Sequence, residues 1–140
     1  MKHPYAVPSR LAPDLARVQA YWQGLLRGGA EMPFADDVNL TDLPDLADRL
    51  LLIDVFDRPE RFRFNSIGAG LAEPGLAGKF LDETLLAWPF AFLRTQCCAT
   101  VESAAPTFLA QEGPRPYARL LLPLWGEGRT GLLLGAAALG

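Results

Sequence analysis

Hydrophobic residues near the start of the chain recur at alternating spacings of four and three. They are Leu11, Leu15, Val18, Trp22 and Leu25. This rhythm predicts an amphipathic helix over residues 13–27, because proline is tolerated in a first helical turn and paired glycines follow the last hydrophobic position. The stripe lasts for about two heptads, which suits packing on its own domain or on the same helix of a second chain.

The period changes to that of β-structure at residue 50. Leu50–Phe56 is a continuous apolar run, and Arg61–Ile67 alternates between polar and apolar residues. With a short polar turn between them, the two segments predict a β-hairpin. Strict alternation would place Phe62, Phe64 and Ser66 on one face of the second strand.

The second half of the chain predicts a helix over residues 89–104, followed by three strands. The strands are Thr107–Gln111, Tyr117–Trp125 and Gly131–Leu139. The last of these is apolar on both faces, so it has to lie in the middle of a sheet that is covered on both sides. We therefore expect an α+β fold, with a helical crossover on one face of an antiparallel sheet and the N-terminal helix on the other.

An interior site is expected between this sheet and the helix at 89–104. Its side chains either line a mostly apolar cavity for a small ligand, with one serine as a polar group, or fill the core. The candidate residues are Phe62, Phe64, Ser66, Phe90, Leu93, Cys97, Val101, Leu120 and Leu122.

Length and composition indicate one domain. The 140 residues are 50% hydrophobic and 21% charged, which is typical of a globular chain. We expect a flexible arm over residues 1–12 and a single domain over 13–140. The net charge of −3, without a cluster of Lys or Arg, argues against nucleic-acid binding.

The sequence also bears on where the protein is located in the cell. The chain opens without the apolar stretch of a signal peptide, and its longest apolar run is too short to cross a membrane. Cys97 and Cys98 are adjacent and cannot link distant segments. These features predict a cytoplasmic protein without membrane insertion.

Residues for catalysis or metal binding are scarce. The single histidine, His3, falls in the arm, so neither a positioned catalytic base nor a histidine metal site is expected. Cys97 lies on the apolar stripe of its helix and is expected to be a small buried hydrophobe, whereas Cys98 could be a redox-sensitive thiol. We predict no catalytic residue and no metal site.

An ordered series of short motifs along residues 11–139 resembles a group of short, stand-alone PAS-domain proteins of alphaproteobacteria. The motifs are Trp22, residues 26–29, Met32-Pro33, residues 42–44, 51–55 and 62–64, Ile67-Gly68, and residues 78–83, 117–124 and 133–136. The resemblance implies a five-stranded antiparallel sheet in the order 2-1-5-4-3, which places the last strand in the middle. PAS domains that bind haem usually do so through a histidine within the domain, and flavin photosensors carry a different cysteine motif, so neither cofactor is expected.

Three functions are compatible with these features. The first is a non-catalytic signalling or regulatory module that acts through protein–protein contacts with a signalling partner and forms a homodimer. Its interface would use the stripe at Leu11, Leu15, Val18, Trp22 and Leu25. The second is a sensor that binds an unidentified small apolar molecule in the interior site, and the third is a small enzyme of isomerase type.

Overall fold

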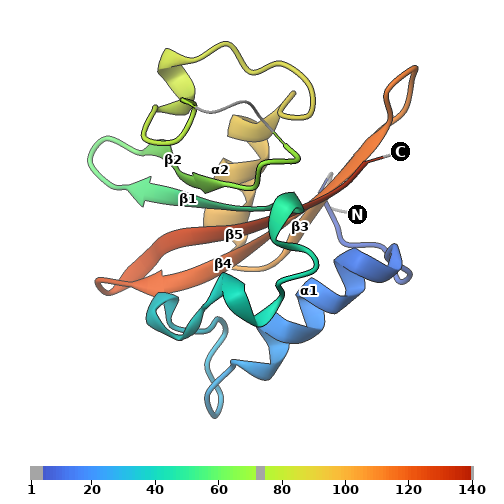
Figure 1. Cartoon of the computed structure of the whole chain (residues 1–140). Coiled ribbons are helices and arrows are strands. Elements are labelled where there is room, and N and C mark those ends of the chain that lie inside the picture. The colour runs from blue at the N-terminus through green and yellow to red at the C-terminus, as the bar shows by residue number, and fades with distance from the viewer. Residues whose placement is uncertain (1–4, 72–74, 140) are drawn as a thin grey trace.

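The computed structural model describes residues 5–71 and 75–139. The helices and strands are α1 (Pro13–Gly24), β1 (Leu50–Phe56), β2 (Arg61–Ile67), α2 (Leu93–Ser103), β3 (Thr107–Gln111), β4 (Tyr117–Gly126) and β5 (Arg129–Leu139). Short 3-10 helices at 35–37, 40–42, 47–49 and 81–83 lie in the connections. Figure 1 shows the sheet between two helical layers.

All five predicted strands are present, and both helices are shorter than predicted. The bounds of β1, β2 and β3 are confirmed, β4 extends one residue further, and β5 begins at Arg129. Helix α2 begins at Leu93 rather than at residue 89, because Phe92 has a left-handed backbone with φ of 61° that interrupts a right-handed helix.

The strand order is β2-β1-β5-β4-β3, and every pair is antiparallel. This confirms both the PAS-like order and the central position of β5. Leu51, Gly135 and Leu121 lie opposite one another across the three middle strands. A Cβ at residue 135 would lie 2.6 Å from Leu51 Cδ2, so glycine here lets the neighbouring leucines meet over β5.

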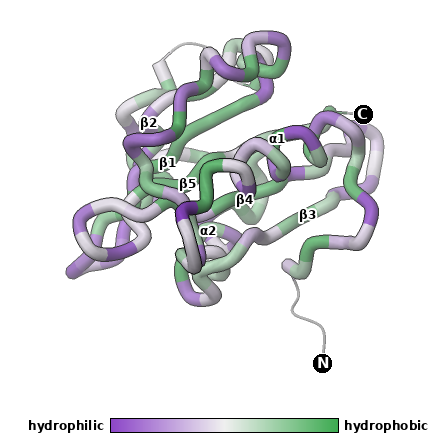
Figure 2. Tube along the Cα trace, turned by 90° about the horizontal axis from the view of Figure 1, so that it is seen from below, coloured by the Kyte–Doolittle hydropathy of each residue, from purple (hydrophilic) through white to green (hydrophobic). Residues whose placement is uncertain are grey.

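Each face of the sheet carries its own apolar cluster. On one face α1 contacts β4 and β5, and residues 30–49 continue this cover; α2 and the chain leading into it cover the other face (Figure 1). Seen from the α1 side in Figure 2, the helix crosses β4 and β5, while β1 and β2 lie to one side of it. The α1 layer therefore covers only part of its face.

Both outer strands have a further segment along their free edges. On the β2 side, Phe64 N–H donates to Lys79 O at 3.0 Å, and Gly78 N–H donates to Phe64 O at 2.6 Å. On the β3 side, Phe108 N–H donates to Tyr5 O at 2.8 Å. The two edges are thus partly occupied by the chain itself.

The described part of the N-terminal arm, from Tyr5 onward, packs on the domain, and the flexible arm over residues 1–12 stays a prediction. Val7 and Leu11 contact the apolar cluster on the α1 face, and Tyr5 is held at the edge of β3. Proline-rich composition suggested a free segment, but two apolar side chains and a backbone hydrogen bond attach it. His3 lies outside the described residues.

Candidate functional site

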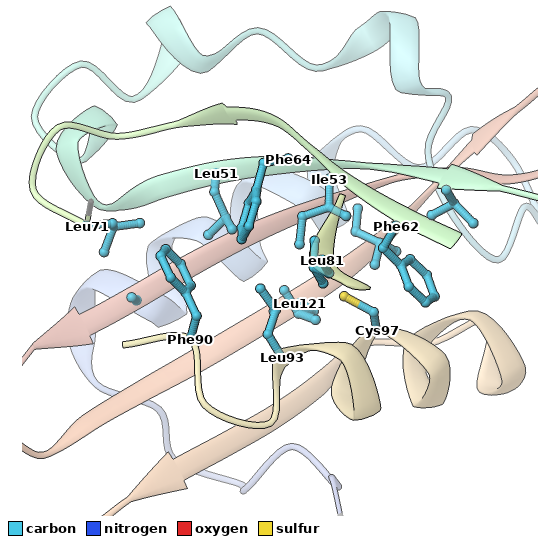
Figure 3. Packing of buried hydrophobic residues seen from close by; sticks show 13 residues of the cluster. Leu51, Ile53, Phe62, Phe64, Leu71, Leu81, Phe90, Leu93, Cys97 and Leu121 are labelled. Atoms are coloured by element: carbon cyan, nitrogen blue, oxygen red, sulfur yellow. The ribbon is translucent and has the colours of Figure 1, made fainter. Parts of the chain in front are cut away.

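The predicted interior site is a packed apolar cluster between the sheet and α2. Phe62, Phe64, Phe90, Leu93 and Cys97 are all buried in it (Figure 3). Val101 packs against it. These six side chains lie together, because Leu93, Cys97 and Val101 at helical spacing on α2 face alternate residues of β2. Their use as a ligand pocket stays a prediction.

Other core residues fill the space between the predicted ones. In Figure 3, Phe90, Leu93 and Cys97 point from the α2 side toward the residues of the sheet, with Leu81 among them. The rings of Phe64 and Phe90 are tilted against each other with centroids 5.3 Å apart. A ligand here would have to displace side chains of a close-packed interior.

Three of the predicted residues lie on the opposite face of the sheet. Leu120 and Leu122 belong to the cluster beneath α1, and Leu121 between them faces α2, so our choice of alternate positions on β4 was wrong by one residue. For Ser66 the cause is a register shift at Leu52/Ile53, which pairs Ile53 with Phe64 but Leu52 with Ser66.

This register shift is a β-bulge at residue 65, and it reverses the faces of the sheet on which the side chains after it lie. Ser66 is paired with Leu52, which packs on the α1 side, while Ile67 packs against the cluster below α2. The Ser66 Oγ atom is buried without a hydrogen-bond partner. Strict alternation therefore predicted the faces of Phe62 and Phe64 but not that of Ser66.

A fully buried arginine is the main polar feature of the α2 face. Arg119, on β4, is 0% exposed. Its Nε donates to Gln96 Oε1 at 2.8 Å, and its Nη1 and Nη2 donate to the carbonyls of Pro89 at 2.8 Å and Ala91 at 3.0 Å. All three acceptors are neutral, and no described carboxylate lies within ion-pair distance of Arg119.

Hydrogen bonds extend this network into α2 and β3. Gln96 Nε2 donates to Thr107 Oγ1 and to Arg119 O, both at 3.2 Å, and the hydroxyls of Thr100 and Thr107 lie 2.6 Å apart. Burial lowers the pKa of Arg119 from its ordinary value. Because its donors end on backbone and amide oxygens, the guanidinium fixes the chain before α2 and leaves little capacity for a substrate.

The two cysteines are poor nucleophiles. Burial raises the pKa of Cys97 well above its ordinary range. Burial also raises the pKa of Cys98, and its hydrogen bond to Glu60 Oε1 at 3.4 Å adds to this effect. Both thiols therefore stay protonated at neutral pH, which disfavours the redox role considered for Cys98.

The hydrophobic stripe of α1 packs on its own sheet. Leu15, Val18 and Trp22 are buried, and Trp22 Nε1 donates to Pro123 O at 2.8 Å. Leu11 packs on the same cluster, whereas Leu25 follows the end of the helix and is only partly buried. Most of this stripe is therefore in contact with β4 and β5 of its own chain, and the dimer interface at these residues stays a prediction.

Two aromatic side chains are exposed where this cover ends. Phe34 is 42% exposed and Trp125 is 40% exposed. Their backbones form an isolated parallel bridge, in which Trp125 N–H donates to Pro33 O at 2.8 Å. The pair therefore joins the segment after α1 to the last turn of the sheet.

The arginine at residue 27 holds Phe34 from its outer side. The Arg27 guanidinium lies 5.3 Å from the ring centroid of Phe34 and forms a two-pronged ion pair with Asp37, at 2.9 and 2.8 Å. Sequence analysis missed Phe34 and Trp125. The only signal was a tryptophan beside a glycine-rich turn, where an exposed aromatic residue is unusual.

Two surface pockets lie on either side of this aromatic pair. The smaller has a volume of about 340 Å³ and is lined by residues 29–32 together with Phe34 and Trp125. The larger, of about 730 Å³, extends over the part of β1, β2 and β5 that α1 leaves uncovered. Phe34 and Trp125 line both.

The floor of the larger pocket is polar, and its groups bind one another. Arg63 Nε donates to Asp54 Oδ2 at 3.0 Å, and Asn65 Nδ2 donates to Asp54 Oδ1 at 3.0 Å. The Arg63 guanidinium also lies 4.8 Å from the ring centroid of Phe56. These groups satisfy one another rather than converging on a small molecule.

A third pocket of about 340 Å³ lies at the other end of β4. It is lined by Trp88, Tyr117 and Arg115 among others, with the Arg115 guanidinium 3.7 Å from a ring centroid of Trp88. Trp88 Nε1 donates to Arg115 O at 2.6 Å. Since these residues already bind one another, the site resembles a packed turn.

Two searches bear on other functions. Within residues 5–71 and 75–139, no group of three or more His, Cys, Asp or Glu side chains is placed to hold a metal ion. Over the same residues, no helix has both the length and the apolar character needed to span a bilayer.

Comparison with known proteins yields one solved structure to report. No protein-family model matches the chain, and no curated protein does. A sensory box sensor histidine kinase from Vibrio cholerae aligns over 94% of this chain and 98% of its own, with a TM-score of 0.48 and 14% identity. At a TM-score below 0.5 the match carries no argument here, so the function has to be argued from this chain's own residues.

Proposed function

We propose that this chain is a non-catalytic regulatory module of PAS type that acts through contacts with another protein chain. The observation that carries the proposal is the exposed pair Phe34 and Trp125, which stands between two surface pockets while the interior is packed. Tryptophan and other large aromatic residues supply much of the binding energy at protein interfaces.

The rigidity of the aromatic pair supports a docking role. Phe34 is fixed by the backbone bridge to Trp125 and by the guanidinium of Arg27, so little conformational freedom is lost when a partner covers it. By contrast, a sensor of apolar molecules would need room beside Leu93 and Cys97, where side chains are in contact.

Catalysis finds little support among the polar groups. Asp54 accepts hydrogen bonds from Arg63 and Asn65. Arg119 donates to the backbone carbonyls before α2. Catalytic acids and bases need a site where their protons can be exchanged with a bound substrate. A docking module makes no such demand.

Site-specific photo-cross-linking in cells that make this protein tests the proposal. A benzophenone-bearing phenylalanine replaces Phe34, and the matched control carries it at Phe92, an exposed phenylalanine at the start of α2. We expect cross-linked protein from position 34 and little from position 92.

Native mass spectrometry of the purified protein provides the opposing result. Equal yields of cross-linked protein at the two positions, together with a stoichiometric small molecule whose removal lowers Tm, would overturn the proposal in favour of a ligand sensor.

A further inference from the structure

The Phe34–Trp125 surface carries unpaired charges of both signs. We define it as Glu31, Phe34, Asp36, Trp125, Glu127 and Arg129, which line the two pockets beside the aromatic pair. Within the described part of the chain, none of its three carboxylates forms an ion pair. Acidic groups next to exposed aromatic rings are therefore free to meet a cation.

Arg129 supplies a cation on the same surface. Its Nη1 donates to Val55 O at 2.8 Å and to Thr130 O at 3.1 Å, so the side chain is held in place by two neutral acceptors. No described carboxylate lies within ion-pair distance of it. A fixed guanidinium that lacks a counter-charge is well suited to bind a carboxylate from another molecule.

We propose that the Phe34–Trp125 surface binds the same surface of a second copy of this chain, in a two-fold symmetric pair. The aromatic pairs meet at the centre, and Arg129 of each copy faces Asp36 or Glu127 of the other. The inference rests on the proposed function, since it names the protein that a docking module of this kind would contact.

Symmetry is the reason for choosing a second copy. In a two-fold interface, residue i of one subunit meets residue j of the other and j meets i, so the surface has to carry both partners of every ion pair. The unpaired Arg129 beside unpaired Asp36 and Glu127 meets this condition. A surface that selects a strongly basic or strongly acidic partner would instead present one sign of charge.

Charge exchange between copies gives a direct test, read as molar mass by light scattering after size exclusion. Arg129→Glu alone, and Asp36→Arg with Glu127→Arg in one chain, are each expected to elute as single chains because like charges then face each other. An equimolar mixture of the two variants is expected to restore the mass of two chains. Failure of the mixture to associate, although each variant is folded by circular dichroism, overturns the proposal.

A second variant covers the case in which Arg129→Glu does not fold. Trp125→Ser removes the central aromatic residue and is expected to weaken the pair by at least about thirtyfold, the effect of losing one interface hot spot. Leu85→Ser is the matched control, since Leu85 is an exposed apolar residue in the loop before α2, and it should leave the mass unchanged.

The wild-type protein decides between the two proposals. A single-chain mass at every concentration overturns the two-fold pair. If position 34 still cross-links to a different protein in cells, the docking function stands without it. If neither association nor cross-linking is found, both proposals fail.

Discussion

Each face of the sheet carries an apolar cluster, but the two covers end differently. Below α2, the apolar cluster and the Arg119 network close the face from Phe62 to Thr107. On the other face, α1 closes only β4 and β5, and the sheet continues past it as a charged floor around Asp54. The comparison places the exposed pair Phe34 and Trp125 at the border of the α1 layer, where the cover of the sheet ends.

On the α1 side of the sheet, two tryptophans differ in the same way as the covered and uncovered parts of that face. Trp22 is 4% exposed and donates to the backbone of β4, whereas Trp125 is 40% exposed and donates only through its backbone N–H. One side chain holds the domain together, and the other is available for contacts. The predictions below test this division.

Removal of the buried tryptophan should have the largest effect. Trp22→Ala leaves a cavity beneath α1 and deprives Pro123 O of its donor, so we expect a loss of about 3–5 kcal/mol in the free energy of unfolding. Urea unfolding followed by circular dichroism measures it. A loss below that of Trp125→Ala would contradict the assignment of α1 to its own sheet.

Replacement of the buried arginine should come next. Arg119→Met leaves the carbonyls of Pro89 and Ala91 without their donor, but it also removes a buried charge. We expect the free energy of unfolding to fall by about 1–3 kcal/mol as the sum of these two effects. Arg119→Lys keeps the charge but lacks the planar fork that reaches three acceptors. We therefore expect the lysine variant to be no more stable than the methionine variant, and wild-type stability for lysine would refute this view of the site.

Alkaline pH should reveal how tightly the α2 face is closed. Burial raises the pKa of Cys97, so above the ordinary thiol pKa of about 8.5 the unfolded chain loses a proton that the folded chain keeps. This contribution to stability is intact below that pH and is lost as the pH rises.

The matched variant isolates the contribution of Cys97. Above about pH 9, wild-type protein should lose about 1.4 kcal/mol more per pH unit than Cys97→Ala does. Urea titrations at a series of pH values give both slopes, and parallel slopes would mean that the thiol is accessible to water.

Removal of the exposed tryptophan should have the smallest effect on stability. For Trp125→Ser we expect a loss of about 1 kcal/mol, because Trp125 is 40% exposed and only the covered part of its side chain packs on the domain. The same urea titration, carried out on the single chain, measures it. A loss close to that of Trp22→Ala would place Trp125 in the core and remove the basis for a docking surface.

Residue patterns along the chain were enough to predict the five strands, the central place of the last one and the two covers, whereas the full strand order was implied by the family resemblance. The two-sided apolar run at 131–139 forced β5 into the middle, and alternation located Phe62 and Phe64. Alternation failed at Ser66, since a bulge depends on how two strands pair and leaves no periodic trace. On β4, a continuous apolar run could not distinguish Leu120 and Leu122 from Leu121.

The candidate site was beyond sequence reasoning for a different reason. Phe34 and Trp125 are distant in the chain, and each looks like an ordinary core residue until the end of the α1 layer is known. The sequence alone likewise suggests that Arg119 is a surface charge on a strand. Two of its acceptors are backbone carbonyls, and these cannot be recognised from residue types. Both features depend on tertiary contacts between segments that are distant in the chain and share no sequence pattern.

The segments along the outer strands limit how this domain can associate. Extending the sheet from one molecule into the next requires free backbone N–H and C=O groups at its edges. Here the N–H of Phe108 is bonded to Tyr5 O. The N–H and C=O of Phe64 are bonded to Lys79 O and to the N–H of Gly78. Growth into fibres by strand addition would first have to peel these segments away. At these two positions strand addition is blocked by the chain itself, which favours recognition between molecules through side chains.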